Sequence, residues 1–328
     1  MKKYIVITSI NQPTEAVKKF AKLKDYNLII VGDKKSPANY LLDNCKFLSV
    51  EEQIRSKFTL AQKLPFNHYC RKMLGYLEAI QQNADVIIDA DDDNIPYDDW
   101  SFPDFTGNYD SLENLGFVNI YQFFTNKKIW TRGFPISLIN NDKNLQPFVQ
   151  KTYCNVGIWQ GLADEDPDVD AIYRLTNNAT CFFEKREPIV CKKGALSPFN
   201  SQNTLIRKEL FPLMYLPTTV TFRYTDILRS LIAQPIMWLY GYNLGFTSAN
   251  VIQKRNPHNY YKDFLSEIPM YETTEKVVEI ASDSISARDD IKTNLTKVYQ
   301  ALQKENIVQE NELKNLESWL YDIDTLMG

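Results

Sequence analysis

Short apolar runs alternate with amphipathic segments over about the first hundred residues. Residues 4–8 and 27–31 are compact and apolar, which predicts two strands, and Pro13 opens a predicted helix between them. The amphipathic segment 69–80 predicts a further helix, and residues 85–88 predict a further strand. This β-α-β order predicts an α/β fold with a parallel sheet and a right-handed crossover.

The composition changes toward the C-terminus. Residues 115–265 mix strand-like runs with aromatic segments and are expected to complete the sheet. From about Thr274, glycine is absent until the last residue, and aliphatic side chains recur at helical spacing. We therefore predict an α/β domain at 1–270 and a C-terminal helical bundle at 271–328. The bundle carries no evident chemistry and is a candidate surface for a homo-oligomer or a partner protein.

Aspartates gather at the end of the strand predicted at 85–88. They are Asp89, Asp91, Asp92 and Asp93. Carboxylates this close repel one another, so the cluster favours a divalent cation, and hard oxygen ligands suit Mg²⁺ or Mn²⁺. Alternate residues of an extended segment share a side, so we predict Asp91 and Asp93 as metal ligands, with Asp89 and Asp91 as the alternative pair. Asp92 would then point toward a nucleoside or support the ligands. A solvated acidic loop or a Ca²⁺ loop would have the same short pattern.

The bulk properties exclude several classes of protein. A net charge of −4 without a block of Lys or Arg argues against a nucleic-acid-binding protein. The five cysteines are widely spaced, which predicts reduced thiols and no zinc site. The apolar runs near residues 4–8 and 232–246 are too short or too often interrupted by polar residues to cross a membrane. We expect a cytoplasmic enzyme, or a catalytic domain separated from its membrane anchor.

Several segments, in order along residues 4–270, resemble the STELLO family of glycosyltransferases. They are 64–72, 91–100, 153–161, 197–203, 222–226 and 254–258. Shorter islands resemble the reversibly glycosylated polypeptides, or UDP-arabinopyranose mutases, which have a Cys-Arg…Gly-Tyr helix before a strand that ends in three aspartates. The resemblance implies a GT-A-like, Rossmann-like mixed sheet flanked by helices, a nucleotide-sugar donor and a divalent metal.

The resemblance also implies roles in metal binding and catalysis. His258 is a candidate third metal ligand, because a late histidine often completes the metal site of GT-A enzymes. Arg132 lies in an Arg-Gly-aromatic-Pro segment in which the mutase-like arginine is glycosylated, and here we expect it to hold the donor phosphates or sugar. Asp226 is the candidate base that would take the acceptor proton in an inverting reaction, with a helix cap as the alternative.

The remaining candidates belong to a predicted donor site. Asp33 ends the second strand and is expected to accept hydrogen bonds from the base or ribose, unless it is a turn residue. Thr8 and Ser9 end the first strand and are expected either to contact the base or to cap the loop. Arg71 is expected to bind phosphate or the aspartates, whereas the adjacent Lys72 is expected to face solvent.

A second acidic cluster and an aromatic residue extend the predicted substrate site. Asp168 and Asp170 resemble the mutase-like Pro-Asp-aromatic-Asp-Ala segment, which implies contacts to donor-sugar hydroxyls. Trp159 is a candidate stacking face for a sugar or a core residue, and Arg223 precedes Asp226 in an Arg-Tyr-Thr-Asp segment. We predict a metal-dependent transferase with a UDP-sugar donor and a glycan or other hydroxyl acceptor. A UDP-sugar mutase and a non-catalytic scaffold are the alternatives.

Overall fold

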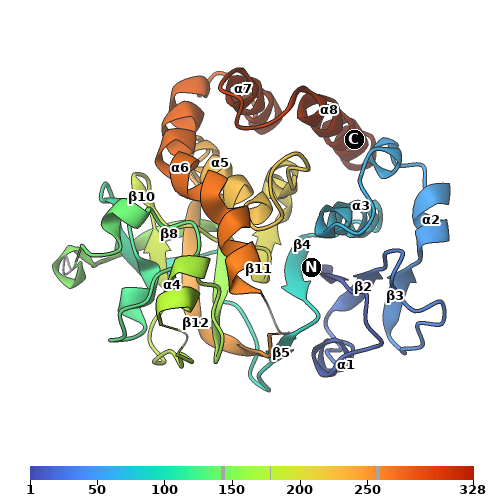
Figure 1. Ribbon diagram of the computed structural model, residues 1–328, viewed down its shortest axis with the longest axis horizontal. Coiled ribbons are helices and arrows are strands. Elements are labelled where there is room, and N and C mark those ends of the chain that lie inside the picture. The colour runs from blue at the N-terminus through green and yellow to red at the C-terminus, as the bar shows by residue number, and fades with distance from the viewer. Residues whose placement is uncertain (142–144, 178, 256–258) are drawn as a thin grey trace.

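The fold is built on one large mixed sheet. The computed structural model describes residues 1–141, 145–177, 179–255 and 259–328. Within these ranges the strands pair in the order β3-β2-β1-β4-β11-β8-β6-β9-β12-β5, and β8 also pairs with β12. These strands are β1 (Lys3–Thr8), β2 (Asn27–Val31), β3 (Cys45–Leu48), β4 (Val86–Asp91), β5 (Asn94–Pro96), β6 (Thr106–Leu112), β8 (Gln150–Asp164), β9 (Ile189–Cys191), β11 (Asn203–Arg207) and β12 (Asn243–Gln253). Two short strands, β7 (Gly116–Phe117) and β10 (Ala195–Leu196), pair separately. The predicted mixed α/β sheet flanked by helices is confirmed (Figure 1).

The N-terminal strands form the parallel part of the sheet, as predicted. Strand β1 is parallel to β2 and to β4, and β2 is parallel to β3. Helix α1 (Glu15–Phe20) connects β1 to β2, and the Thr14 hydroxyl caps its first turn. In the register of the sheet, Thr8 lies opposite both Val31 and Asp91. The carboxyl ends of three strands therefore meet at one edge, where open α/β sheets bind their ligands.

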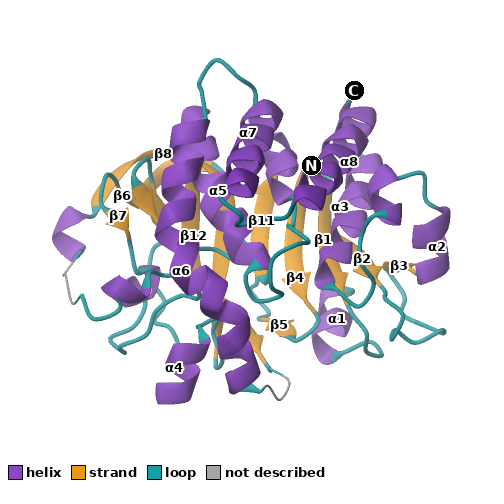
Figure 2. Ribbon diagram, turned by 45° about the horizontal axis from the view of Figure 1, so that its top comes forward, coloured by secondary structure: helices purple, strands orange, loops and turns teal. Residues whose placement is uncertain are grey.

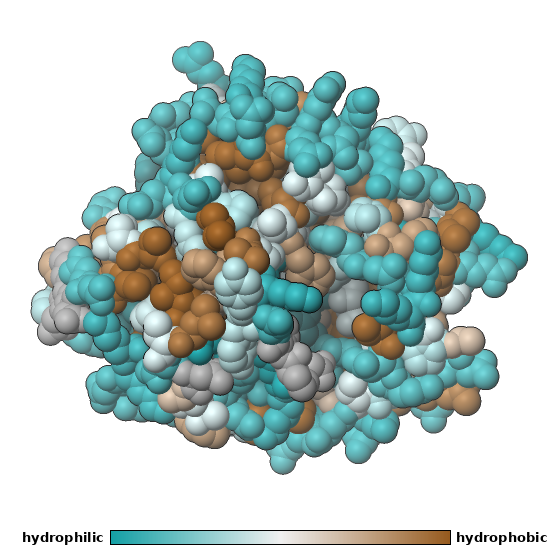
Figure 3. All heavy atoms as spheres, viewed as in Figure 1, coloured by the Kyte–Doolittle hydropathy of each residue, from teal (hydrophilic) through white to brown (hydrophobic). Residues whose placement is uncertain are grey.

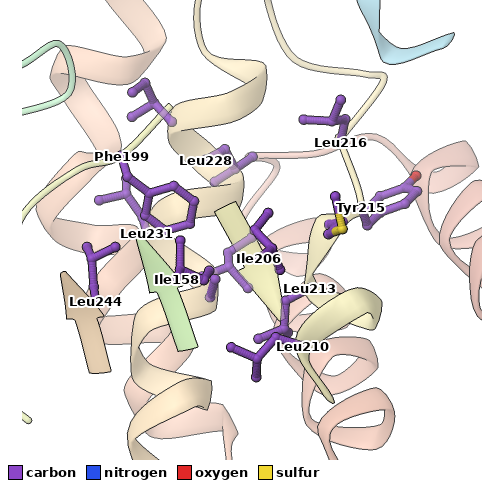
Figure 4. Packing of buried hydrophobic residues seen from close by; sticks show 14 of the residues in the cluster. Ile158, Phe199, Ile206, Leu210, Leu213, Tyr215, Leu216, Leu228, Leu231 and Leu244 are labelled. Carbon is purple, nitrogen blue, oxygen red and sulfur yellow. The ribbon is translucent and has the colours of Figure 1, made fainter. Parts of the chain in front are cut away.

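Strand β11 joins the two halves of the sheet. It is antiparallel to both β4 and β8, and Asn203 lies opposite Ala90. This pairing brings the segment just before β11 to the edge at which the aspartates lie. Helix α5 (Thr225–Leu239) packs over this region, and Figure 4 shows apolar side chains of β8, β11 and α5 in one cluster, Ile206 among them. The sheet order thus places residues near 90, 200 and 226 around one point.

The remaining helices cover the sheet. They are α2 (Val50–Arg55), α3 (Lys72–Gln81), α4 (Ala171–Thr176), α6 (Tyr260–Ser284), α7 (Ile291–Lys304) and α8 (Glu310–Met327). Helix α8 lies against α3 and α7 against α5 (Figures 1 and 2). Trp319 of α8 belongs to the same buried cluster as Leu74 of α3 and Leu228 of α5. The boundary predicted at 270/271 falls inside α6, so the C-terminal helices share the core of the α/β part.

The outer surface of the C-terminal helices is largely polar. Hydrophilic side chains dominate the α7–α8 end of the face in Figure 3. Most apolar side chains of these helices point inward, as the burial of Val298, Leu302 and Ile323 shows, whereas Tyr321 and Met327 are exposed. Among the helices that the structure describes, none combines the length and the apolar character needed to cross a bilayer.

Candidate functional site

Two cavities adjoin at the carboxyl ends of β1, β2 and β4. The aspartate cavity, about 230 Å³ in volume, is lined by these predicted residues: Thr8, Asp91, Asp93, Arg132, Asp168, Arg223 and Asp226. The β1–β2 cavity, about 490 Å³ in volume, is lined by the predicted residues Thr8, Ser9, Asp33 and Arg71. Both cavities share Thr8, Tyr69, Asp92 and Phe222 as wall residues. The fold therefore brings most of the predicted site residues to one continuous depression.

The ammonium group of Lys72 lies among the aspartates. Its Nζ is 2.8 Å from Asp89 Oδ1 and 2.8 Å from Asp91 Oδ1. It also donates to the carbonyl oxygens of Ala90, at 2.8 Å, and Ser201, at 3.1 Å. The side chain is fully buried, so the prediction that it faces solvent is wrong. Lys72 is the first residue of α3, directly after a 3₁₀ turn, and its side chain reaches the end of β4.

Two cations hold Asp89 outside the cavity. One carboxylate oxygen accepts from Lys72, and the other accepts from Arg229 Nη1 at 3.0 Å. The side chains of Asp89, Lys72 and Arg229 are all buried. Burial alone would lower the pKa of Lys72, but Asp89 and Asp91 raise it to about 12, so the lysine is charged. Both carboxylate oxygens of Asp89 are paired and its side chain does not line the aspartate cavity, so the structure favours Asp91 and Asp93 over the alternative pair Asp89 and Asp91.

Asp91 and Asp93 both line the aspartate cavity. Asp91 uses Oδ1 for Lys72, and Asp93 accepts from Gln253 Nε2 at 3.2 Å and from Asn94 Nδ2 at 3.0 Å. Desolvation raises the pKa of Asp91 to about 7, an effect that Lys72 opposes and Asp93 strengthens. Desolvation also raises the pKa of Asp93. These shifts mark negative charge that the surrounding protein only partly neutralises.

A divalent cation fits this pair of carboxylates. Over the described ranges, no group of three or more His, Cys, Asp or Glu side chains is placed to hold a metal ion by itself. Mg²⁺ sites are commonly made of one or two carboxylates completed by substrate phosphates, and Mn²⁺ takes similar oxygen ligands. Asp91 and Asp93 match that donor set, because both line the cavity and the surrounding protein only partly neutralises their negative charge. His258, the predicted third ligand, lies outside the described residues.

The ends of β1 and β2 are fixed by short polar contacts. The buried Ser9 hydroxyl donates to the carboxylate of Asp92, which also accepts from Asn11 Nδ2 at 3.0 Å. Ser9 therefore caps the loop, which is the simpler of its two predicted roles. Asp33 accepts from backbone N–H groups and lines the β1–β2 cavity, and Thr8 stands where the two cavities meet.

Arg71 lies in the wall of the β1–β2 cavity. Its Nε donates to Gln53 Oε1 at 2.7 Å, and its Nη1 donates to the carbonyl oxygen of Leu64 at 3.0 Å. The guanidinium lies over the ring of Phe66, 4.0 Å from its centroid. Its Nη2 is buried and, within the described residues, has no hydrogen-bond partner. Lys72, not Arg71, contacts the aspartates, so the predicted contact between Arg71 and the aspartates is wrong.

Arg132 is clamped between two carboxylates. Its Nε and Nη2 donate to Asp168 at 2.9 and 2.8 Å, and its Nη1 and Nη2 donate to Asp226 at 2.9 Å each. All three side chains are buried at the cavity wall. Gly133 has φ of +84°, and a Cβ there would lie 2.4 Å from Ile227, so this turn requires glycine directly after Arg132.

The clamp fixes the charges of its members. Burial alone would raise the pKa of Asp168 and of Asp226, but Arg132 lowers both pKa values below the ordinary range. In turn the two carboxylates hold the pKa of Arg132 above its usual value against the effect of burial. Arg132 therefore has little capacity left for phosphate, and its direct effect is to keep Asp168 and Asp226 ionised and in place.

Two predicted substrate residues are structural. Trp159 is completely buried, and its ring packs so closely on Gly245 that a Cβ there would lie 2.2 Å from it. It therefore belongs to the core. Asp170 is also fully buried and caps α4, accepting from the backbone N–H of Tyr173 at 2.8 Å and from Trp130 Nε1 at 2.7 Å. Neither side chain lines the aspartate cavity. Trp159 therefore has the core role that was the alternative to sugar stacking, and the predicted contact of Asp170 with donor-sugar hydroxyls is wrong.

The replacement Asp170→Ala should lower the free energy of unfolding by about 2 kcal/mol, because it removes a helix cap and leaves the buried Trp130 N–H unpaired. Urea denaturation measures this loss. Asp290→Ala, which removes the exposed cap of α7, is the matched control and should cost about 1 kcal/mol. Loss of nucleotide-sugar binding at unchanged stability would contradict the structural role of Asp170.

Several residues of the site carry no clear signal in the sequence. Arg255 lines the aspartate cavity with its side chain 8% exposed, and its Nε lies 3.1 Å from Asp166. Asn200 also lines it and donates to Asp168 at 2.7 Å. Arg229 had a usable signal, because it follows Asp226 by one helical turn and so shares its face of α5.

Comparison with known proteins confirms the predicted resemblance to the STELLO family. The family model of the STELLO glycosyltransferases matches residues 223–328. The probable glycosyltransferase STELLO1 of Arabidopsis thaliana is 24% identical over 98% of this chain and 44% of its own length. STELLO2 of the same plant is 27% identical over 73% of this chain and 34% of its own length. The chain thus spans less than half the length of the curated relatives it matches.

Similarity to solved structures is lower. A mycobacterial protein has a TM-score of 0.42 at 10% identity, over 87% of this chain and 76% of its own. The glucosyl-3-phosphoglycerate synthase of M. tuberculosis has a TM-score of 0.36 at 10% identity, over 87% of this chain and 81% of its own. At these scores the likeness adds nothing to what the sheet order itself establishes.

Proposed function

We propose that this chain, STELLO-type in sequence, is a metal-dependent glycosyltransferase that moves a sugar from a UDP-sugar to a hydroxyl group of a glycan. The observation that carries the proposal is the pair of adjoining cavities at the carboxyl edge of the sheet. The β1–β2 cavity offers Asp33 and the unpaired Nη2 of Arg71. The aspartate cavity offers the carboxylates of Asp91 and Asp93, whose negative charge is only partly neutralised. A nucleoside diphosphate sugar needs both kinds of surface side by side.

The β1–β2 cavity would take the nucleoside. Asp33 supplies carboxylate oxygens that accept hydrogen bonds from the base or ribose. Arg71 supplies its buried Nη2 as a donor to a carbonyl or phosphate oxygen of the ligand. Phe222 is about half exposed and lines both cavities, so its ring is available where the nucleoside passes into the diphosphate.

The aspartate cavity would take the diphosphate and the sugar. Asp91 and Asp93 would hold Mn²⁺ or Mg²⁺, which when bound supplies Lewis-acid stabilisation of the departing nucleoside diphosphate. Arg223 and Arg255 line the same cavity and contribute positive charge toward the phosphates. Lys72 neutralises the inner side of the aspartate cluster, which limits the repulsion between the cluster and an incoming diphosphate.

Asp226 is the base that we assign to an inverting transfer. It lines the cavity, and Arg132 keeps it ionised, which is the state a base needs before it accepts a proton. The same contact lowers its basicity, so the acceptor hydroxyl would have to bind close to a carboxylate oxygen. The charged, doubly paired Arg132 weighs against the mutase alternative, because a glycosyl-arginine requires a nucleophilic, neutral guanidine.

Calorimetric titration of UDP and a panel of UDP-sugars, with and without Mn²⁺, tests the proposal. Binding should depend on Mn²⁺, and Asp91→Asn/Asp93→Asn should weaken it at least about tenfold, as expected for loss of both charged ligands. The exposed pair Asp98→Asn/Asp99→Asn is the matched control. A wild-type protein that binds no UDP ligand, or binds it equally without Mn²⁺, would overturn the proposal.

A further inference from the structure

Helix α8 carries two buried carboxylates far from the aspartate cluster. Glu312 and Asp322 are 0% and 3% exposed, and both face the α/β part of the fold. Each accepts hydrogen bonds from the backbone of a segment that leads into the site. We propose that Glu312 and Asp322 are positioning residues, one for the sugar side of the site and the other for the nucleoside side. This inference rests on the proposed function.

Glu312 binds the loop before α5. Its carboxylate accepts from the backbone N–H groups of Thr218, at 2.9 Å, and Thr219, at 2.7 Å. It also accepts from the Thr219 hydroxyl, at 2.6 Å, and from the Tyr215 hydroxyl. One helical turn further along α8, Asn315 Nδ2 donates to the Thr218 hydroxyl at 2.9 Å. The donors of this loop therefore converge on one buried negative charge, where hydrogen bonds are strongest.

The loop held by Glu312 continues directly into the site. Phe222 follows Thr219 by three residues, and Arg223 and Asp226 come next, all of them wall residues of the aspartate cavity. Asp226 belongs to the clamp around Arg132. A shift of this loop would therefore move mainly the sugar side of the cavity. It would reach the β1–β2 cavity at one side, where Phe222 packs on His68 and Tyr69.

Asp322 binds a different segment. Its carboxylate accepts from the backbone N–H groups of Thr59 and Leu60 and from the Thr59 hydroxyl, each at 2.9 Å. These groups begin a short 3₁₀ helix, after which the N–H of Leu64 donates to the carbonyl oxygen of Leu60. The carbonyl oxygen of Leu64 then accepts from Arg71 Nη1 at 3.0 Å. Asp322 therefore supports the arginine of the β1–β2 cavity.

The two contacts are separable from the docking of α8. Trp319 lies in the core between them and donates from Nε1 to the carbonyl oxygen of Pro212 at 2.9 Å. Leu316 and Ile323 are buried on the same side of the helix. An amide in place of either carboxylate keeps the side-chain shape but turns an N–H group toward other N–H donors. Glu312→Gln and Asp322→Asn should therefore release one segment each while α8 stays packed.

Hydrogen exchange of the ligand-free protein is the first test. Glu312→Gln should speed exchange about tenfold at 215–226, and Asp322→Asn should do so at 59–71, as expected for loss of a charged hydrogen-bond acceptor. Asp324→Asn, an exposed acid of the same helix paired with Lys292, should change neither segment. If Glu312→Gln does not fold, Glu312→Asp replaces it in this test, because it keeps the charge but its shorter side chain moves the carboxylate away from the N–H groups of Thr218 and Thr219. Equal changes in both segments, or none, would overturn the proposal.

Titration with UDP and a UDP-sugar is the second test. Asp322→Asn should weaken the binding of UDP itself about tenfold. Glu312→Gln should leave the affinity for UDP within about twofold of the wild-type value and reduce the extra affinity that the sugar of a UDP-sugar provides. A general loss of stability would weaken the binding of UDP and of the UDP-sugar equally in both variants. That result would show that Glu312 and Asp322 do not position separate sides of the site. A wild-type protein that binds no UDP ligand would instead remove the proposed function, and the exchange result would still decide whether the two carboxylates hold their segments.

Discussion

The variant Lys72→Met should lose about 3–5 kcal/mol of its free energy of unfolding at neutral pH, because it removes the buried cation that the fully buried Asp89 and the partly exposed Asp91 share. Asp89 keeps Arg229 as a partner, but Asp91 loses the only cationic side chain within bonding distance among the described residues. Methionine fills a similar volume, so the loss reports charge more than a cavity. Urea denaturation followed by circular dichroism gives the difference.

A surface lysine provides the control for this experiment. Lys46 pairs with Glu78, but its side chain is 43% exposed, so Lys46→Met should cost less than about 1 kcal/mol. Adding Asp91→Asn to Lys72→Met should restore part of the lost stability, since the uncompensated charge is then gone. If Lys72→Met is as stable as Lys46→Met, the buried lysine is not what neutralises the aspartate cluster.

The variant Arg132→Gln should also lose about 3–5 kcal/mol at neutral pH, because two buried carboxylates lose their shared partner. The loss should depend on pH. In the wild type, Asp168 and Asp226 have lowered pKa values, so their stabilising contribution is present above the unfolded pKa of about 3.9 and declines as the pH falls below it. In the variant, burial without Arg132 raises both pKa values, so the two carboxylates take up protons already above about pH 4. Urea unfolding from pH 7 to pH 3 should therefore show the difference in free energy of unfolding between wild type and variant narrowing steadily as the pH falls.

Two further variants decide what the pH dependence means. Arg132→Gln/Asp168→Asn/Asp226→Asn should regain stability at pH 7 and lose the dependence on pH, because no unpaired buried charge remains. Arg55→Gln removes an exposed arginine paired with Glu51 and should change stability by less than about 0.5 kcal/mol. If the difference in free energy of unfolding between Arg132→Gln and wild type stays constant down to pH 3, then Arg132 does not stabilise the ionised forms of Asp168 and Asp226.

The parallel part of the sheet could be predicted because its strands have strong local patterns. The runs that became β1, β2 and β4 are short, apolar and followed at once by polar residues. Since parallel strands end at the same edge, Thr8, Asp33 and Asp91 had to come close together. Asp91 and Asp93 line the same cavity. The twofold alternation on which the pair was predicted does not place them there, because β4 ends at Asp91 and residues 92 and 93 form a turn.

The position of Lys72 could not be predicted from helical periodicity. A 3₁₀ turn precedes it, and such a turn changes the angular position of every residue that follows relative to an α-helix started earlier. The prediction began a regular helix at 69 and so assigned the lysine to the outer face. Which end of the sheet a first-turn side chain reaches depends on tertiary packing, and the sequence does not show it.

Trp159 and Asp170 show a different limit. Strand β8 is buried along nearly its whole second half on both faces, so no alternation separates core positions from site positions. An aromatic residue there has the same pattern whether it stacks on a sugar or fills the core. Asp168 and Asp170 lie two residues apart and look alike in the sequence. In the structure Arg132 binds Asp168, whereas Asp170 caps α4, and only the position at which α4 begins separates the two roles.

The pairing of β4 with β11 has a consequence for how the protein folds. Residues near 90 meet residues near 204 in this pairing, and Lys72 also reaches the carbonyl oxygen of Ser201. More than a hundred residues must be looped out before these contacts form, and such closure is entropically costly and slow. The four N-terminal parallel strands can assemble from nearer neighbours. The aspartate cavity is therefore a late product of folding, and until β11 joins the sheet the nascent chain exposes an open edge of β4.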